Sequence, residues 1–228
     1  MKRKIITTGD GSKTIQIEDW DEQYHSKHGA IQEAQHVFIK HGLQYTNERF
    51  SSSASGPICI LEIGFGTGLN AFLTMIEAEK LNRAINYVGV EAFPVKEEEL
   101  QLLNYTEQLS KEAYQSKFKA LHDTAWESEH EITPNFILQK QQKDFKEISE
   151  INHFDLIYFD AFGARVQPEL WTEDIFRIMF EALRPNGVLV TYSAKGSVRR
   201  AMLAVGFKVD KLPGPPGKRE MLRAYKAV

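Results

Sequence analysis

The sequence predicts an α/β fold in which helices cover both faces of a doubly wound parallel sheet. The chain has 228 residues, enough for one full domain with a short extension. After residue 57, short apolar runs alternate with helical stretches, as expected for parallel strands joined by crossover helices. Hydrophobic residues make up 42% and charged residues 26%, so a disordered or fibrous chain is excluded.

Residues 1–57 differ from the rest and are predicted to form an N-terminal extension or lid segment. Residues 14–17 favour a small strand, and residues 30–41 favour a short helix that ends before Gly42. The small, polar run 51–57 is typical of a linker. We therefore expect an extension over 1–57 and a main domain over 58–228.

Five buried strands are expected in the main domain, at 58–63, 85–90, 136–138, 154–159 and 187–192. The helices between them are predicted at 69–81, from Pro94 onward, at 106–121 and at 168–183. The tail is different, because 207–212 and 221–227 flank a proline-rich loop. These two runs favour an antiparallel pair at the end of the sheet.

Several classes of protein are excluded by simple counts. The longest apolar run is far shorter than the ~20 residues that a membrane span needs. The N-terminus is basic but lacks the apolar core of a signal peptide, so a cytoplasmic location is expected. One cysteine, Cys59, allows no internal disulfide and no zinc site built from cysteine pairs. Four histidines fall irregularly without cysteine or paired acids, so no metal site is expected (His25, His28, His36, His41).

The most informative segment joins the first buried strand to the first helix. It reads Glu62-Ile-Gly64-Phe65-Gly66-Thr67-Gly68-Leu-Asn70. Glycines there let the backbone approach a ligand and expose amide groups at a helix start. A dinucleotide fingerprint requires Gly or Ala where Leu69 stands, and Phe65 and Glu62 fit poorly beside a pyrophosphate. The pattern favours a nucleoside ligand without phosphates, such as S-adenosylmethionine.

Two carboxylates follow the next strands of the predicted sheet. Glu91 ends the second strand, where it can accept hydrogen bonds from both ribose hydroxyls. Asp144 follows the third strand, where it can accept from an adenine amino group while Phe145 lies against the ring. The alternative for Asp144 is a helix N-cap. Because the carboxyl ends of parallel strands converge on one crevice, the set predicts a nucleoside site.

The fourth strand ends at Asp160, which is predicted to face the middle of the ligand. Its carboxylate can hold the ligand's amino group or accept a proton from an incoming amine; the alternative is a buried capping carboxylate. The following loop carries Phe162, Arg165 and Trp171, residue types that suit the rim of a base-binding site. For Trp171 the alternative is core packing. A sulfonium donor is already activated, so alignment of the reacting atoms is the main demand on the protein.

Several stretches resemble the MnmC-type and MnmD-like methyltransferases of tRNA wobble-uridine modification. The glycine motif with Asn70 and the run Asp160-Ala-Phe162 carry the resemblance in the main domain. Tyr24-His-Ser26 carries it in the extension, and the tail adds Lys218-Arg219-Glu-Met. Together these motifs are specific, and the resemblance spans about residues 15–225.

The resemblance implies a seven-stranded class I (Rossmann-like) S-adenosylmethionine-dependent methyltransferase fold whose last strand is antiparallel. The implied reaction methylates the amine of 5-aminomethyl-(2-thio)uridine at position 34 of tRNA, giving 5-methylaminomethyl-(2-thio)uridine. Asp160 is implied to neighbour the amine. The implied cofactor-binding residues are Glu62, Gly64, Phe65, Gly66, Thr67, Gly68, Asn70, Glu91, Asp144 and Asp160, with Tyr24 and Ser26 folding over them. Two-domain relatives carry an FAD oxidase, and none is expected in a chain that ends at Val228.

Three other functions remain open on the residues alone. The chain could methylate a free small-molecule amine or a protein side chain, or transfer an aminopropyl group as spermidine synthases do. Those synthases need several acids to hold a polyamine, and here Ala161 follows Asp160 directly. The third alternative is a non-catalytic RNA- or cofactor-binding module.

The net charge of −3 conceals two unlike parts. Residues 195–228 hold nine Lys and Arg against two acids, a net of +7, while residues 1–194 hold 19 against 29, a net of −10. Lys218 and Arg219 lie in the loop between the last two predicted strands, which is expected on the ligand side of the sheet. The basic tail therefore predicts contacts with RNA phosphates.

Overall fold

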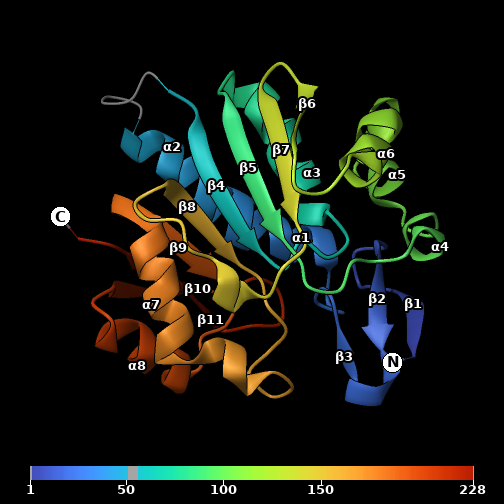
Figure 1. Ribbon diagram of the computed structural model, residues 1–228. Coiled ribbons are helices and arrows are strands. Elements are labelled where there is room, and N and C mark those ends of the chain that lie inside the picture. The colour runs from blue at the N-terminus through green and yellow to red at the C-terminus, as the bar shows by residue number, and fades with distance from the viewer. Residues whose placement is uncertain (1, 51–55, 228) are drawn as a thin grey trace.

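The computed structural model describes residues 2–50 and 56–227. The predicted linker at 51–57 therefore lies mostly outside the described residues. The main sheet has eight strands in the spatial order β10-β11-β9-β8-β4-β5-β7-β6 (Figure 1). Their bounds are β4 Ile58–Ile63, β5 Ile85–Val90, β6 Glu129–Thr133, β7 Phe136–Gln141, β8 Phe154–Phe159, β9 Leu183–Thr191, β10 Lys208–Pro213 and β11 Glu220–Tyr225.

The central strands are parallel, which confirms the predicted doubly wound α/β class. β4 pairs with β5 and β8, β5 with β7, and β8 with β9, all in parallel. β11 is antiparallel to β9 and pairs with β10, so the predicted antiparallel end is confirmed. The sheet has one strand more than the seven expected, because β6 pairs antiparallel with β7. β6 is a polar edge strand without an apolar run, so periodicity did not reveal it.

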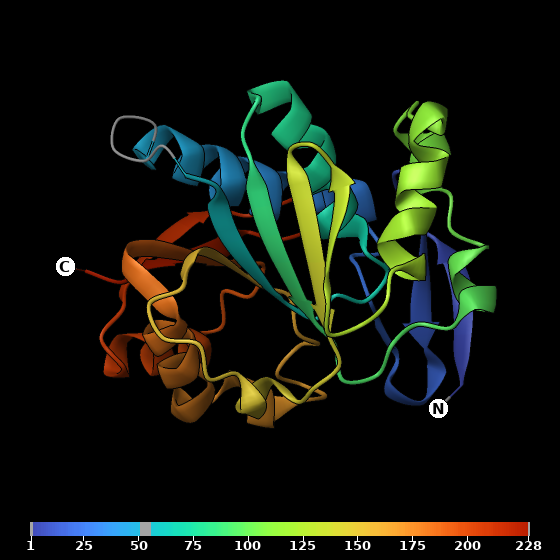
Figure 2. The ribbon, with the colours of Figure 1, turned by 45° about the horizontal axis from the view of Figure 1, so that its top comes forward.

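Helices cover both faces of this sheet (Figures 1 and 2). The helices of the described residues are α1 Ala30–Ala34, the π-helical η2 Gln35–Gln44, α2 Tyr45–Phe50, α3 Leu69–Leu81, α4 Glu97–Leu100, α5 Tyr105–Gln108, α6 Gln115–Asp123, α7 Glu173–Ala182 and α8 Gly196–Ala204. Of these, α4 lies beside β1 (Arg3–Thr7) and β2 (Lys13–Ile17) rather than on the main sheet (Figure 1). Short 3-10 turns are η1 Glu18–Trp20, η3 Glu112–Tyr114, η4 Phe145–Glu147 and η5 Pro168–Trp171.

The two faces of β4 show how the sequence builds two cores. All six residues of β4 are buried, because helices pack on both of its sides. Ile58 and Ile60 share one core with α1, η2 and α3. Leu61 and Ile63 point to the other face and share a second core with α7 and α8.

The N-terminal segment joins the fold in two ways. β1 Arg3–Thr7, β2 Lys13–Ile17 and β3 Glu22–Gln23 form a separate small antiparallel sheet. The helical part packs on the main sheet through residues such as Val37 and Phe38. The sequence predicted that this helix would end before Gly42, but it continues to residue 50. A Cβ at Gly42 would lie 3.0 Å from the Tyr158 ring, so this glycine permits close packing.

Candidate active site

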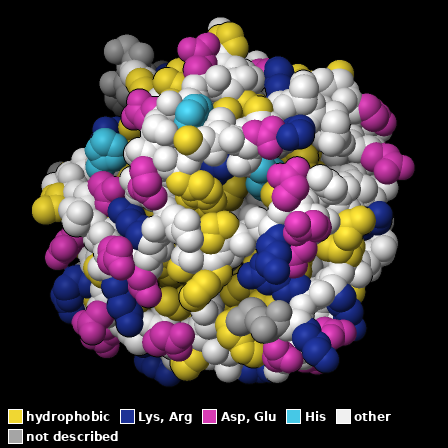
Figure 3. Space-filling model, turned by 45° about the vertical axis from the view of Figure 1, so that its right-hand side comes forward, with side chains coloured by type: hydrophobic (Ala, Val, Ile, Leu, Met, Phe, Trp, Pro, Cys, Tyr) yellow, Lys and Arg dark blue, Asp and Glu magenta, His cyan; other side chains and the backbone are white. Residues whose placement is uncertain are grey.

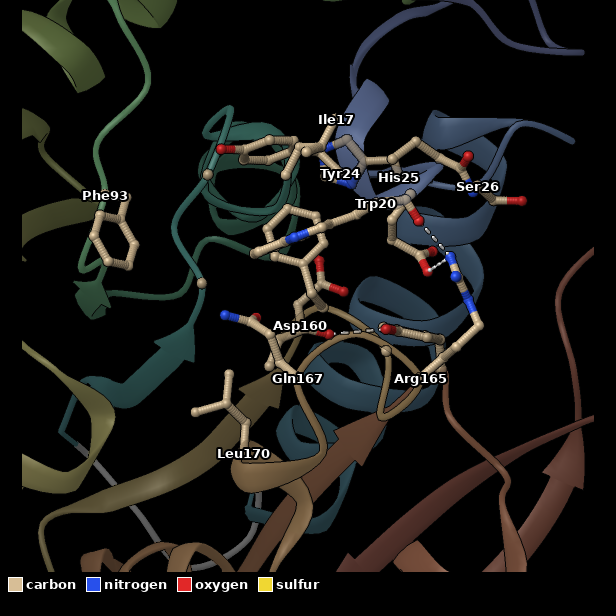
Figure 4. Close-up of a pocket in the computed structure, with 18 of the residues that line it drawn as sticks. Ile17, Trp20, Tyr24, His25, Ser26, Phe93, Asp160, Arg165, Gln167 and Leu170 are labelled. Atoms are coloured by element: carbon tan, nitrogen blue, oxygen red, sulfur yellow. Dashed lines mark hydrogen bonds and ion pairs between the residues drawn. The ribbon is translucent and has the colours of Figure 1, made fainter. Parts of the chain in front are cut away.

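A cavity of about 810 Å³ opens where β4, β5, β8 and β9 end, and the N-terminal segment covers it (Figure 4). That volume suits a ligand of nucleoside size or larger. In Figure 4, Tyr24 and Trp20 lie on one side of Asp160, and Gln167 and Leu170 lie on the other. Of the site residues predicted from the sequence, those that line the cavity are Tyr24, Ser26, Gly64, Gly66, Glu91, Asp144, Asp160, Phe162, Arg165 and Lys218.

The glycine loop forms the floor of the cavity, in a conformation that only glycine adopts readily. The φ angles of Gly64, Gly66 and Gly68 are +89°, +50° and +71°. A Cβ at Gly66 would lie 3.1 Å from the Tyr24 ring. A Cβ at Gly64 would lie 3.0 Å from the carbonyl oxygen of Asp160. The loop is therefore packed tightly between the N-terminal segment and the end of β8.

Glu91 is fixed against this loop at the end of β5. Its carboxylate accepts hydrogen bonds from the backbone N–H of Gly66 at 3.0 Å and of Phe93 at 2.9 Å. Burial raises the pKa of Glu91 above its ordinary value, while these backbone bonds oppose the rise. A carboxylate oriented in this way can accept hydroxyl donors from a bound ligand.

Asp160 follows β8 and is held by Asn70, at the start of α3. The Asn70 Nδ2 donates to Asp160 Oδ2 at 2.9 Å and to Glu62 Oε1 at 2.9 Å. Tyr87 donates to the other Glu62 oxygen at 2.7 Å. Burial raises the pKa of both Asp160 and Glu62 well above the ordinary range. Asp160 is thus a carboxylate that takes up a proton readily.

Asp144 caps a short helical turn and also lines the cavity. Its side chain accepts from the Lys146 backbone N–H at 2.9 Å, which makes it the N-cap of η4. Asp144 and Phe145 also line the cavity. The alternatives of capping and ligand contact are therefore compatible, because one carboxylate oxygen can cap while the other accepts from a ligand.

Three aromatic rings form one wall of the cavity. Phe162 packs edge-to-face against Trp20, with ring centroids 5.8 Å apart, and against Tyr24 at 4.9 Å. Trp171, by contrast, is only 5% exposed and packs in the core beside Phe159. Its indole N–H donates to the Phe162 carbonyl at 2.8 Å. The expected base contact of Trp171 is thus corrected to core packing that supports the Phe162 loop.

Arg165 connects the Phe162 loop to the N-terminal segment. Its guanidinium donates to the Trp20 carbonyl at 2.9 Å and the Asp21 carbonyl at 3.1 Å, and it pairs with Glu22 at 2.9 Å (Figure 4). This side chain was predicted to contact RNA. In the structure its donors hold the two walls of the cavity together.

Other predicted site residues do not reach the cavity. Phe65 packs beside His122 and Trp126, and Thr67 bonds to His25 at 2.7 Å and to Tyr105 at 3.0 Å. These side chains point away from the ligand space because they anchor the glycine loop from behind. The predicted residues outside the cavity lining are Glu62, Phe65, Thr67, Gly68, Asn70, Trp171 and Arg219. Arg219 is exposed.

The structure adds residues that the sequence did not single out. Glu33 and Tyr192 line the cavity, and so do Trp20, Lys27 and Lys195. Glu33 carries a signal that could have revealed it. It lies in the apolar stripe of the 30–41 helix, three residues after Ala30, and an acid in such a stripe indicates a buried carboxylate.

Basic and acidic side chains are interspersed on the face that brings α4–α6 and β1–β2 forward (Figure 3). That face carries no extended basic field. Among the described residues, no group of three or more His, Cys, Asp or Glu is arranged to hold a metal ion. None of the helices in the described ranges is both long and apolar enough to cross a membrane.

Residues 101–227 match a family model described as S-adenosyl-L-methionine-dependent methyltransferase. The chain belongs to this family. It is therefore an enzyme that uses S-adenosylmethionine. The positive-φ glycines, Glu91 and Asp144 fit a nucleoside ligand, because they offer close backbone approach and hydrogen-bond acceptors along one edge of the sheet.

The predicted resemblance to MnmC proteins is confirmed by relatives and by a solved structure. The chain is 29% identical to the tRNA 5-methylaminomethyl-2-thiouridine biosynthesis bifunctional protein MnmC of Ectopseudomonas mendocina, over 90% of this chain and 34% of that protein. It is 30% identical to the MnmC of Leptospira interrogans, over 90% of this chain and 32% of that protein. The chain thus spans about a third of these relatives.

Two solved structures have a fold similar to that of this chain. The crystal structure of MnmC2 from Aquifex aeolicus is 29% identical, with a TM-score of 0.79 over 100% of this chain and 71% of that one. A spermidine synthase in complex with the transition-state analogue AdoDATO has a TM-score of 0.55 at 14% identity, over 95% of this chain and 70% of that one. The second similarity concerns the fold alone.

Proposed function

We propose that this enzyme methylates the amine of 5-aminomethyl-(2-thio)uridine at position 34 of tRNA, giving 5-methylaminomethyl-(2-thio)uridine. The observation that carries the proposal is the half-buried Asp160 carboxylate, which lines the same cavity as the aromatic wall of Trp20 and Phe162. An amine acceptor needs a base, and a nucleobase needs a stacking surface. The printed name of the MnmC relatives supports the same substrate.

The aminomethyl group is an ammonium ion at neutral pH, so it must lose a proton before it can react. We propose that an Asp160 oxygen accepts this proton, because its raised pKa brings it closer to that of the amine. S-adenosylmethionine supplies a methyl carbon that bonds to the amine nitrogen as its bond to sulfur breaks, the electron pair going to sulfur. The remaining task of the protein is to hold the two reactants in line.

The proposed cofactor contacts follow the lining of the cavity. Gly64 and Gly66 would offer close backbone approach, Glu91 would accept from ribose hydroxyls, and Asp144 from the adenine amino group. Tyr24 and Ser26 would cover the cofactor from the N-terminal segment. We propose that Glu62, Phe65, Thr67, Gly68 and Asn70 act through the shape of the loop, since they lie behind the cavity.

For tRNA, we propose that exposed cations at the cavity mouth bind phosphates. Lys27 and Lys195 line the cavity and are exposed, and neither has a carboxylate within ion-pair distance among the described residues. Arg219 lies in the neighbouring loop and is also exposed. Cations at this rim would position the anticodon loop while the target nucleotide enters the cavity. A tRNA substrate also supports the expected cytoplasmic location.

The deciding experiment is a methyl-transfer assay with radiolabelled S-adenosylmethionine and three acceptors. We expect nucleoside analysis to find 5-methylaminomethyl-(2-thio)uridine in tRNA that carries the 5-aminomethyl group. We expect no label in tRNA lacking that group, and none in putrescine, which tests methylation of a free small-molecule amine. Equal labelling of tRNA without the aminomethyl group would overturn the proposal.

A further inference from the structure

A second carboxylate, Glu33 of α1, lies in the cavity wall near Asp160. Glu33 is only 6% exposed, although it is an acid on a helix packed against the sheet. Its Oε1 accepts from the Ser26 backbone N–H at 3.2 Å. Its Oε2 is 2.5 Å from the ammonium nitrogen of Lys218. A buried carboxylate with both oxygens in use is held in one place.

Lys218 completes a charged cluster at this point. Its ammonium nitrogen lies 3.9 Å from the centroid of the Tyr192 ring, within the range of a cation–π contact. The Tyr192 hydroxyl donates to the Ala161 carbonyl at 2.8 Å, next to Asp160 in the chain. The Lys218 charge is therefore fixed beside the proposed proton acceptor rather than directed toward solvent phosphates.

The titratable and charged groups facing this pair come from every element around it. They are Asp160 after β8, Tyr192 after β9, Glu22 of β3, His25 and His28 before α1, and Lys195 before α8. Asp160 is influenced directly, because the negative charge of Glu33 raises its pKa and the positive charge of Lys218 lowers it. The pair thus imposes two opposing charges on the reacting centre.

We propose that Glu33 and Lys218 are an ion pair, buried at Glu33 and half-buried at Lys218, that sets the protonation of the acceptor amine and of Asp160. This inference rests on the proposed function. Lys218 disfavours a second cation nearby, so it promotes loss of the ammonium proton. Glu33 fixes Lys218 in position and strengthens Asp160 as the proton acceptor. The proton passes from nitrogen to an Asp160 oxygen, and the nitrogen keeps the electron pair used for the new bond to carbon.

The test is the pH dependence of the single-turnover methylation rate at saturating tRNA and cofactor. In the plot of rate against pH, the acidic limb is the part in which the rate rises as the proton acceptor loses its proton. Lys218→Met removes the positive charge, so we expect this limb to move to higher pH by about one unit or more. Glu33→Gln removes the negative charge while its amide oxygen still accepts from Lys218. We expect its limb to move to lower pH. The double variant should lie near the wild type, because both charges are gone.

Two controls separate this role from a structural or phosphate-binding one. Lys218→Arg keeps the charge, so its limb should stay near that of the wild type. Lys195→Met removes an exposed cation of the same cavity that does not act directly on Asp160, so it should weaken tRNA binding and move the limb much less than Lys218→Met does. Cofactor affinity, measured by calorimetry, reports whether each variant still folds around its ligand.

The outcomes separate the two proposals. Absence of methylation by the wild type would overturn the proposed function and this inference with it. With an active wild type, unmoved limbs in Lys218→Met and Glu33→Gln would overturn this inference alone. Limbs that move in the same direction would also overturn it, because opposite charges must have opposite effects.

Discussion

The Asn70 side chain connects the buried Glu62 to the half-buried Asp160, since its Nδ2 lies 2.9 Å from an oxygen of each carboxylate. This contact joins the start of α3 to the ends of β4 and β8. It therefore ties the glycine loop to the proposed proton acceptor. Both carboxylates accept from one amide group, and Glu62 has Tyr87 as a second donor, so Asp160 is the acid more sensitive to loss of Asn70.

Replacement of Asn70 by Ala should lower the free energy of unfolding by about 1–3 kcal/mol, because the buried Glu62 and the half-buried Asp160 each lose a donor. Methylation should fall more steeply than stability, since Asp160 would no longer be oriented. Urea unfolding and single-turnover assays measure the two effects. Asn86→Ala, on β5 and outside the cavity lining, is the matched control. Full activity in Asn70→Ala would contradict the role given to this contact.

Gly66→Val should abolish measurable cofactor binding. The φ angle of Gly66 is +50°, and a Cβ there would lie 3.1 Å from the Tyr24 ring. A β-branched residue is strained in this conformation and would displace Tyr24. Calorimetry with S-adenosylmethionine measures the loss. Gly56→Val is the control, because a Cβ at Gly56 meets nothing within 4 Å. Retained affinity in Gly66→Val would refute the assignment of the loop.

Glu91→Gln should weaken S-adenosylmethionine binding about tenfold or more, because a hydrogen bond to a charged group contributes roughly 1.5–3 kcal/mol. Affinity of the wild type should also fall on acidification. Burial raises the pKa of Glu91, so its carboxylate becomes protonated at a higher pH than an exposed glutamate does. Titrations at several pH values test both points, with Glu98→Gln on the exposed α4 as control. An unchanged dissociation constant in Glu91→Gln would exclude a ribose contact.

Binding of tRNA should weaken as salt concentration rises, because phosphate contacts release counterions. Lys195→Met should reduce the slope of log affinity against log salt by about 1 and weaken binding to all tRNAs alike. Filter binding over a range of salt concentrations gives the slope. Lys119→Met on α6, where the lysine pairs with Asp123, should leave the slope unchanged. A Lys195→Met slope equal to that of the wild type would place the RNA elsewhere.

Because of His25, the free energy of unfolding should decrease as the pH falls from neutral into mild acid. Desolvation lowers its pKa to about 4, from the ordinary 6.5. The folded state therefore resists a proton that the unfolded chain accepts, and stability falls as the pH drops from about 6.5 toward 4. His25→Gln removes this contribution. The difference between wild type and variant in urea unfolding isolates it, because the buried carboxylates are common to both. A pH-independent difference would contradict the lowered pKa.

Local sequence patterns were enough to predict much of the sheet. The predicted strands 58–63, 85–90 and 154–159 match β4, β5 and β8, because strands buried on both faces appear as continuous apolar runs. The predicted helix 69–81 matches α3, because the glycine loop in the sequence marks where the helix starts. The edge strand β6 and the continuation of the first helix through Gly42 depend on pairing and packing partners, which a local pattern does not contain.

The sequence by itself determined the α/β class, the glycine loop and the acids at the strand ends. These features follow from periodicity and from the rule that parallel strands end on one side of the sheet. Only the tertiary structure decided how those residues are used. In the folded protein Trp171 packs in the core, and Arg165 forms an ion pair with Glu22. Glu33 contacts Lys218, which is 185 residues away in sequence. Such contacts depend on where distant segments meet, and that is set by packing of the whole chain rather than by any local run of residues.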